Sequence, residues 1–275
     1  MATRTMNRRP SVSGVAVIAA LIAPLASGCA PLRSSPPATS ADLPQGAETV
    51  PLDPAELTLE IDNAYWPMTP GTRWTYRETD EEGNELEVVV TVTTETREIA
   101  NGVTARVVRD TVFSAGAVVE DTFDWYAQDA EGNVWYLGED TAEFEDGEVT
   151  STAGSFEAGV DGALPGIIMP GTPSDGMQYR QEYYEGEAED NGEILSTDEQ
   201  AEVPFGHFDD VLLTKDTITI EPEVLEYKLY APEVGPVLVF GVSGGGGREE
   251  LITMQQISNH DAKAAGTSPL GESYP

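Results

Sequence analysis

The stretch Leu86–Phe113 decides the fold and reads LEVVVTVTTETREIANGVTARVVRDTVF. Its two arms, Leu86–Thr96 and Val103–Phe113, are rich in β-branched residues that partly alternate with polar ones, which is typical of strands. Asn101-Gly102 lies between the arms and is a strong signal for a tight hairpin turn. This stretch therefore predicts an antiparallel β-hairpin.

The same features recur on both sides of the hairpin. Further strands are expected at residues 123–127, 134–138, 211–220, 225–230 and 236–242. Outside the N-terminal region, no window keeps a helical period of 3.6 residues for three turns. We expect an all-β fold of antiparallel meander sheets, arranged as a curved half-barrel-like sheet or as two packed sheets.

The strands also show a weak internal repeat. Tyr76 and Tyr179 are 103 residues apart, while Tyr126 and Tyr230 are 104 apart. Several such pairs keep their order at nearly one offset, which predicts two similar β modules. The first module covers residues 59–154 and the second covers residues 176–257. The connecting loop, residues 155–175, is rich in Gly and Pro around Ile167-Ile168-Met169, which we expect to form an exposed apolar tip.

The N-terminal region has the features of an export signal. Three arginines precede an apolar stretch from about Val15 to Leu25, which is too short to span a bilayer. Cys29, the only cysteine, follows the small residues Ala26-Ser27-Gly28. We expect residues 1–28 to be a signal peptide and Cys29 to be the attachment point of a lipid. Ordinary export with an incidental cysteine is the alternative.

This pattern resembles the lipobox of bacterial lipoproteins, in which small residues precede the cysteine that becomes the modified N-terminus. Ala26 departs from the family, which usually has Leu at that position. The resemblance implies a diacylglycerol or palmitate anchor on Cys29. It further implies an exported protein held at the cell membrane or the outer membrane.

Two segments lack any apolar period. Residues 29–58 are rich in Pro, Ser and Ala, which predicts a flexible tether between the lipid and the folded part. Residues 258–275 are similarly small and polar, which predicts a disordered tail.

The chain is strongly acidic, with 49 acidic and 14 basic residues and a formal net charge of −35. Such a charge repels nucleic acid and anionic headgroups, so we expect no nucleic-acid partner. The acids are spread along the chain, which favours a solvated acidic surface. A charge excess that serves cations or a basic partner is the alternative.

No motif of a catalytic, cofactor or metal site is evident, and we expect none of the three. The sequence contains two histidines, His207 and His260, and lacks a G-x-S-x-G elbow, an H-E-x-x-H motif and a Walker motif. The acidic segments 80–84 and 129–133 could hold calcium weakly, but their Gly-Asn pairs favour hairpin turns. Glycosidase chemistry needs two carboxylates, and the sequence does not single out a pair.

Aromatic residues are the remaining candidates for a site. Adjacent aromatics on a strand point to opposite faces, so one set would fill the core while the other could line a concave surface for an apolar or sugar ligand. The candidate ligand-binding residues are Trp74, Tyr76, Trp125, Trp135, Tyr179, Tyr230, Ile167, Ile168 and Met169. Core packing alone is the alternative.

Two aromatic motifs carry a family resemblance. Gly71–Tyr76 matches G-x-x-W-x-Y, and Trp125–Tyr136 matches W-Y-x-x-x-x-x-G-N-V-W-Y. Residues 64–257 thereby resemble an uncharacterised family of bacterial lipoproteins. More loosely, a lipidated curved sheet is similar in architecture to lipoprotein carriers of the LolA and LppX type.

The family resemblance is silent about activity. From the expected lipid anchor, the strand aromatics and the Ile167-Ile168-Met169 loop, we expect a membrane-anchored, non-enzymatic binding or structural protein of the cell envelope, whose ligand would be an apolar small molecule. Two other classes stay open. One is an envelope hydrolase that uses carboxylates, and the other is an acidic module that binds cations or basic partners.

Overall fold

The computed structural model describes residues 43–80, 83–244 and 247–275. These residues all belong to one compact unit. The expected signal peptide and Cys29 lie outside the described residues, so lipid attachment stays a prediction.

Within this described part of the chain, fourteen antiparallel strands form a single sheet. The strands of the first half are β1 (Thr72–Thr79), β2 (Glu85–Glu98), β3 (Thr104–Ser114), β4 (Ala117–Gln128), β5 (Val134–Glu145) and β6 (Glu148–Ser151). Two short strands follow, β7 (Phe156–Glu157) and β8 (Gly166–Met169). The strands of the second half are β9 (Gln178–Arg180), β10 (Asp190–Val203), β11 (Gly206–Ile218), β12 (Leu225–Ala231), β13 (Gly235–Ser243) and β14 (Arg248–Gln256). The expected all-β, antiparallel fold is confirmed.

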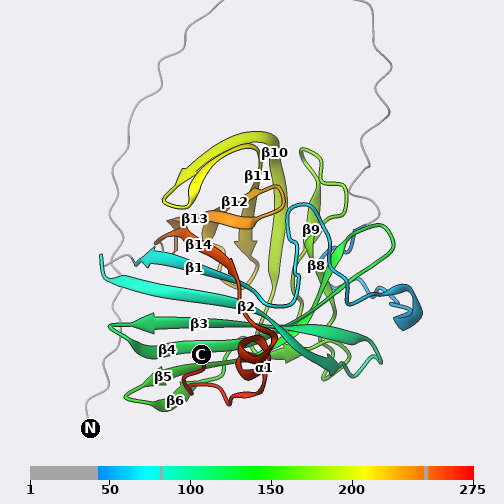
Figure 1. Ribbon diagram of the computed structural model, residues 1–275. Coiled ribbons are helices and arrows are strands. Elements are labelled where there is room, and N and C mark those ends of the chain that lie inside the picture. Colours follow the sequence, from blue (N-terminus) through cyan, green and yellow to red (C-terminus); the bar gives the residue numbers. More distant parts are fainter. Residues whose placement is uncertain (1–42, 81–82, 245–246) are drawn as a thin grey trace, which may run out of the picture. The chain divides into compact units, whose positions relative to one another are not determined.

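The strand order is β6-β5-β4-β3-β2-β1-β14-β13-β12-β11-β10-β9, while β7 and β8 both pair with β5 (Figure 1). The sheet is therefore open, with β6 and β9 at its two ends. Each half is a meander, and the two are joined where β1 pairs with β14. The same strand order in both halves is compatible with a duplicated module, which stays a prediction.

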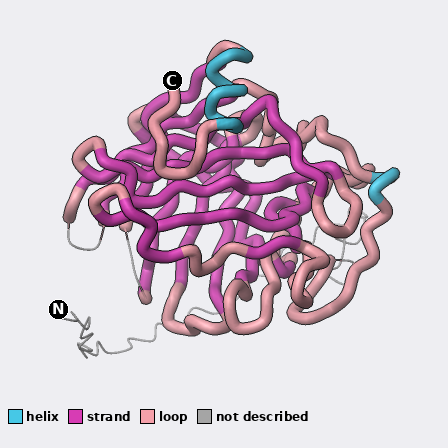
Figure 2. Tube along the Cα trace, turned by 90° about the horizontal axis from the view of Figure 1, so that it is seen from below, coloured by secondary structure: helices cyan, strands magenta, loops and turns pink. Residues whose placement is uncertain are grey.

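The sheet bends so that the inner faces of its halves meet. In Figure 2 the strands nearest the viewer run across the picture and those behind run up it. Side chains of β1 reach the beginning of β13: Trp74 Nε1 donates to the carbonyl of Val234 (2.8 Å), and the Tyr76 hydroxyl donates to the carbonyl of Pro236 (3.1 Å). The hydrophobic core takes its buried residues from both halves of the sheet.

The connecting segment differs from the expected exposed tip. Ile167 and Met169 are fully buried in β8, which pairs with β5. Gly166 makes this packing feasible, because a Cβ there would lie 1.9 Å from the carbonyl oxygen of Gln181. The expectation failed because this short apolar run pairs with β5, a strand that comes about thirty residues earlier in the chain.

The expected flexible tether is wrong for residues 43–58, which lie against the sheet. The side chain of Arg180 is fully buried and donates to the carbonyls of Gly46, Glu48 (2.8 Å) and Pro165 (2.7 Å). Thr58 pairs with Gln128 at the end of β4. A buried guanidinium needs several acceptors, and backbone carbonyls of the supposed tether supply two of the three.

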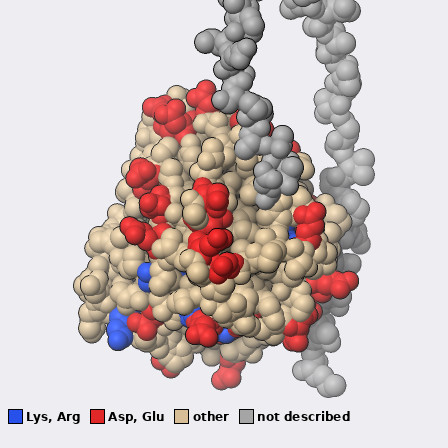
Figure 3. Space-filling model, turned by 90° about the vertical axis from the view of Figure 1, so that its right-hand side faces the viewer, with Lys and Arg blue, Asp and Glu red and all other residues tan. Residues whose placement is uncertain are grey.

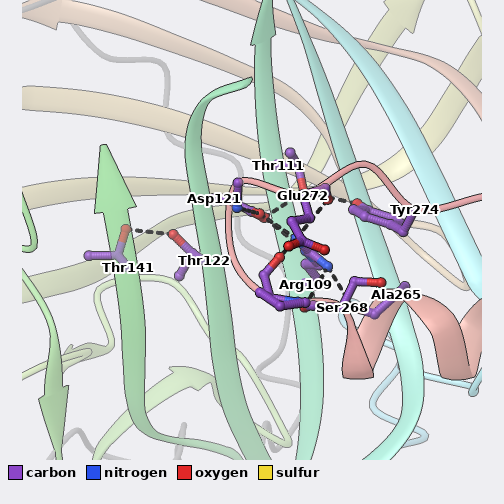
Figure 4. Close-up of polar contacts among 11 residues, drawn as sticks. Arg109, Thr111, Asp121, Thr122, Thr141, Ala265, Ser268, Glu272 and Tyr274 are labelled. Carbon is purple, nitrogen blue, oxygen red and sulfur yellow. Dashed lines mark hydrogen bonds and ion pairs between the residues drawn. The ribbon is translucent and has the colours of Figure 1, made fainter. Parts of the chain in front are cut away.

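The expected disordered tail is also wrong. Ser258 caps helix α1 (Asn259–Thr267), which packs on β2 and β3, and the chain then folds back over Arg109. The fully buried Arg109 guanidinium pairs with Asp121 and donates to the carbonyls of Ala265 (2.9 Å) and Ser268 (3.1 Å) (Figure 4). We call this arrangement the Arg109 clamp. It orders a segment whose own composition favours disorder.

Candidate ligand-binding cavity

A cavity of about 370 Å³ lies on the inner face of the sheet, between its two halves. Its walls come from β1–β5, β8 and β12–β14, from the loop before β1 and from the segment after β9. Its aromatic lining residues are Trp66, Trp74, Tyr76, Tyr126, Tyr136 and Tyr230. Its charged lining residues are Glu78, Asp110, Asp124, Glu182, Glu226, Glu249 and Lys228.

The period of two residues along a strand produces this lining. On β1 the inward residues are Trp74, Tyr76 and Glu78, and on β12 they are Tyr230, Lys228 and Glu226. Three antiparallel ladders separate these strands, so β1 and β12 run in opposite directions. Both series therefore change from aromatic to acidic in the same direction, which gives the cavity an aromatic end and an acidic end.

Trp66 is the centre of the aromatic end. Its ring centroid lies 5.4 Å from that of Tyr230 and 6.3 Å from that of Tyr126, which in turn stacks on Tyr136 at 4.9 Å. Asn63 holds the loop that carries Trp66, because its Oδ1 accepts from the backbone N–H of Trp66 (3.2 Å). The rings thus form a wall suited to an apolar or cationic group.

At the acidic end, like charges face one another. Glu78 and Glu249 are directly opposite in the β1–β14 ladder, a destabilising arrangement when both are ionised. Burial, followed by the nearby charge of Glu78, raises the pKa of Glu249 to about 7. On the facing half, Oδ1 of Asp110 is buried and has no hydrogen-bond partner, and burial raises the pKa of this carboxyl well above its ordinary value.

Asp124 and Glu139 share the hydroxyl of Tyr136, which lies 2.7 Å from an oxygen of each. A hydroxyl has one hydrogen to donate, so one of the two carboxyls must itself donate while both contacts persist. Burial raises the pKa of Asp124 to about 7, and burial together with the charge of Asp124 raises that of Glu139 to about 8. This triad therefore retains a proton near neutral pH.

Lys228 is the only basic residue among the described residues that line the cavity. Its ammonium lies 3.0 Å from Oδ2 of Asp216 and 3.7 Å from Oε2 of Glu226. Burial alone would lower the pKa of Lys228, but the carboxylates of Asp216 and Glu226 raise it well above the ordinary value. The ammonium is thus already paired, and no second basic residue among the described residues lines the cavity.

The structure brings together four of the residues proposed from the sequence: Trp74, Tyr76, Tyr230 and Ile168 line the cavity. It places the other five elsewhere, namely Trp125, Trp135, Tyr179, Ile167 and Met169. All nine are buried, so whether any contacts a ligand stays a prediction.

Three aromatic candidates have other contacts. Trp125 lies beneath the Arg97 guanidinium, 3.9 Å from the ring centroid. Trp135 donates through Nε1 to Asp129 (2.8 Å). The ring of Tyr179 covers Gly192, where a Cβ would come within 2.6 Å of it.

Sequence reasoning missed Tyr126 and Tyr136, which lie one residue after Trp125 and Trp135 and hence on the opposite face. The sequence of β4 contains a pattern that could have identified Tyr126, because Asp124 and Tyr126 are on the same face of the strand. A carboxyl two residues before an aromatic residue on one strand marks a polar cavity wall more readily than a sealed core.

The acidic turn before β5 behaves as turn chemistry predicts. Asp129 accepts hydrogen bonds from the backbone N–H groups of Glu131 (3.0 Å) and Asn133 (2.9 Å). Across the described residues, no group of three or more His, Cys, Asp and Glu side chains is placed to hold a metal ion. His207 lies exposed at the beginning of β11.

Figure 3 shows that Asp and Glu side chains are spread over the face it displays and outnumber Lys and Arg there. Within the described part of the chain, no helix has the length and apolar character that a membrane crossing requires.

No protein-family profile matches this chain, and no curated protein matches it. Two solved structures are similar. One is a protein with a YmcC-like fold from Bacteroides fragilis, inferred to be exported: TM-score 0.44 and 15% identity over 70% of this chain and 99% of that one. The other is an inferred lipoprotein from Parabacteroides distasonis: TM-score 0.38 and 14% identity over the same shares of the two chains. At these scores the likeness supports no inference about activity.

Proposed function

We propose that this chain is an exported, membrane-anchored protein of the cell envelope that binds a small molecule in its cavity and performs no chemistry on it. The expected signal peptide and Cys29 support the location. The cavity between the two halves of the sheet supports the binding role.

One observation carries the proposal: six aromatic rings and six carboxyl groups from distant strands converge on a cavity of about 370 Å³. Binding pockets for small molecules typically measure 300–1,000 Å³ and combine apolar walls with a few polar groups. A core that served stability alone would fill this space with side chains, because protein interiors are close-packed. Such a core would also contain apolar groups in place of buried carboxyls, because burying a carboxyl is energetically costly.

Filling the cavity tests this function. Val239 lines the cavity on β13, and we expect Val239→Phe to weaken binding of the neutral fluorophore N-phenyl-1-naphthylamine at least tenfold. The ring would occupy the volume that the probe needs. The measurement is fluorescence enhancement on titration of the full chain.

Val242→Phe is the matched control, because Val242 is on the same strand, is 52% exposed and does not line the cavity. It should bind the probe like the parent protein. Equal loss in both variants, or no enhancement with the parent protein, would overturn the proposal.

Asp124 and Glu139 favour a second candidate, a hydrolase that uses two carboxyl groups. They lie within hydrogen-bond reach of one hydroxyl, and Asp124 lines the cavity. General acid–base catalysis, however, requires environments that push the two pKa values apart, whereas burial raises both. Release of nitrophenol from nitrophenyl glycosides that Asp124→Asn abolishes would favour the hydrolase over the binding protein.

A further inference from the structure

We infer that the cavity binds an organic cation: a small molecule with an ammonium group at one end and an apolar body at the other. This inference rests on the proposed binding function and names the class of its ligand. The ammonium would lie among the carboxyls, and the body would lie against the aromatic rings.

The charge of the lining is the first reason. Six carboxyl groups face one ammonium, Lys228, and that ammonium is held by Asp216 and Glu226. Carboxylates away from water need a partner of opposite charge or a proton. An anionic ligand would add to the repulsion, and a neutral ligand would remove water without replacing it by a countercharge.

The second reason is the unpaired acceptor of Asp110. Oδ1 of this residue is buried without a hydrogen-bond partner, and Asp110 lines the cavity. A buried acceptor left unsatisfied is unfavourable, and a donor on the ligand would satisfy it. An ammonium carries such donors together with the missing charge.

The third reason is the facing pair Glu78 and Glu249, which are directly opposite in the β1–β14 ladder and both line the cavity. Two carboxylates in this position repel each other unless a cation or a proton lies between them. The described side chains offer no cation here besides Lys228, and they form no group placed to hold a metal ion.

The aromatic end of the cavity indicates the chemistry of the rest of the ligand. Trp66, Tyr126 and Tyr230 form a continuous wall with centroid separations of 5.4 and 6.3 Å. Ring faces attract both apolar groups and alkylammonium groups. The volume of about 370 Å³ suits a molecule of amino-acid to nucleoside size, which excludes a folded basic partner as the occupant.

A matched series of probes tests the ligand class. 4-Phenylbutylamine, 4-phenylbutan-1-ol and 4-phenylbutyrate share one body and differ in the charge of the head group. In calorimetric titrations of the full chain at pH 8, we expect the amine to bind at least tenfold more tightly than the alcohol, and the carboxylate to bind more weakly than either.

Charge-neutral variants locate the head group. We expect Asp110→Asn and Glu249→Gln each to lower the affinity for the amine at least fivefold while leaving that for the alcohol within twofold. Glu148→Gln is the control, because Glu148 is an exposed acid on β6, outside the cavity. A merely structural role of the two carboxyls would change both affinities together.

Proton release provides an independent readout. At pH 7 the ammonium should displace protons from the cavity carboxyls, so the heat of amine binding should vary with the ionisation enthalpy of the buffer. Alcohol binding should show no such dependence.

The outcomes separate this inference from the proposed function. Equal affinities for the amine and the alcohol would overturn the inference that the ligand is a cation, but would leave the proposed binding function intact. If none of the three compounds binds, the cation inference also fails. Failure of N-phenyl-1-naphthylamine as well would remove the binding function too.

Discussion

Replacing Arg109 by methionine is expected to lower the free energy of unfolding by about 3–5 kcal/mol, the range observed when one partner of a buried ion pair is removed. Arg109 and Asp121 are both fully buried, and the guanidinium also donates to carbonyls of the C-terminal segment, including those of Ala265 and Ser268 (Figure 4). Methionine fills similar volume but leaves the Asp121 carboxylate unpaired and these carbonyls without donors.

Urea unfolding followed by tryptophan fluorescence measures this effect. Arg77→Met is the matched control: Arg77 pairs with Glu250 on an exposed surface (3.0 Å), so its loss should cost less than about 1 kcal/mol. If Arg109→Met does not fold, Arg109→Lys keeps the charge but loses the forked geometry, and amide hydrogen exchange in α1 should accelerate. Similar stability of the Arg109 and Arg77 variants would contradict the role of the Arg109 clamp.

The second large effect concerns pH: the protein is expected to become less stable as pH rises from 5.5 to 8. Burial is the main cause that raises the folded-state pKa values of Asp124 and Glu249 to about 7 and of Glu139 to about 8, from ordinary values of 3.8 or 4.5. The folded state thus binds these protons more tightly than the unfolded state. The stabilisation is complete below about pH 4 and is lost as pH rises through 7 to 8.

Most surface carboxyls are already ionised at pH 5.5, so the window from 5.5 to 8 isolates the buried groups. One unit of pKa difference corresponds to about 1.4 kcal/mol, and several groups titrate together, so a fall of at least about 3 kcal/mol is expected. Urea unfolding at constant ionic strength measures it. Asp124→Asn should flatten the profile, and a free energy of unfolding that rises across this window would refute the assignment.

The buried carboxyls of this protein differ in how completely their hydrogen bonds are satisfied. The carboxyl of Asp121 is buried and fully paired, with Arg109, the Thr111 hydroxyl (2.8 Å) and the backbone N–H of Gly271 (2.7 Å) around it. The carboxyl of Asp110, on the neighbouring strand β3 opposite Thr122, has an unpaired buried oxygen and lines the cavity. The same chain thus satisfies a buried acid completely where it serves stability and leaves one unsatisfied where we propose a ligand.

Much of the fold could be predicted from local pattern. The hairpin around Asn101-Gly102 is present as β2 and β3, and the five further strands expected correspond to β4, β5, β11, β12 and β13. These elements are readable because a strand's two faces differ over a few residues and because Gly-Asn and Asn-Gly turns need positive φ. Candidate site residues were found only in part, since four of nine line the cavity.

The sequence by itself determined the class of fold, the acidic character and the expected export signal, because composition and short-range periodicity carry that information. Only the tertiary structure decided that Tyr126 and Tyr136, and not Trp125 and Trp135, face the cavity, since adjacent aromatics give no clue to which face is enclosed. Tertiary structure likewise ordered α1 and residues 43–58, because the buried guanidiniums of Arg109 and Arg180 take their acceptors from segments far away in the chain.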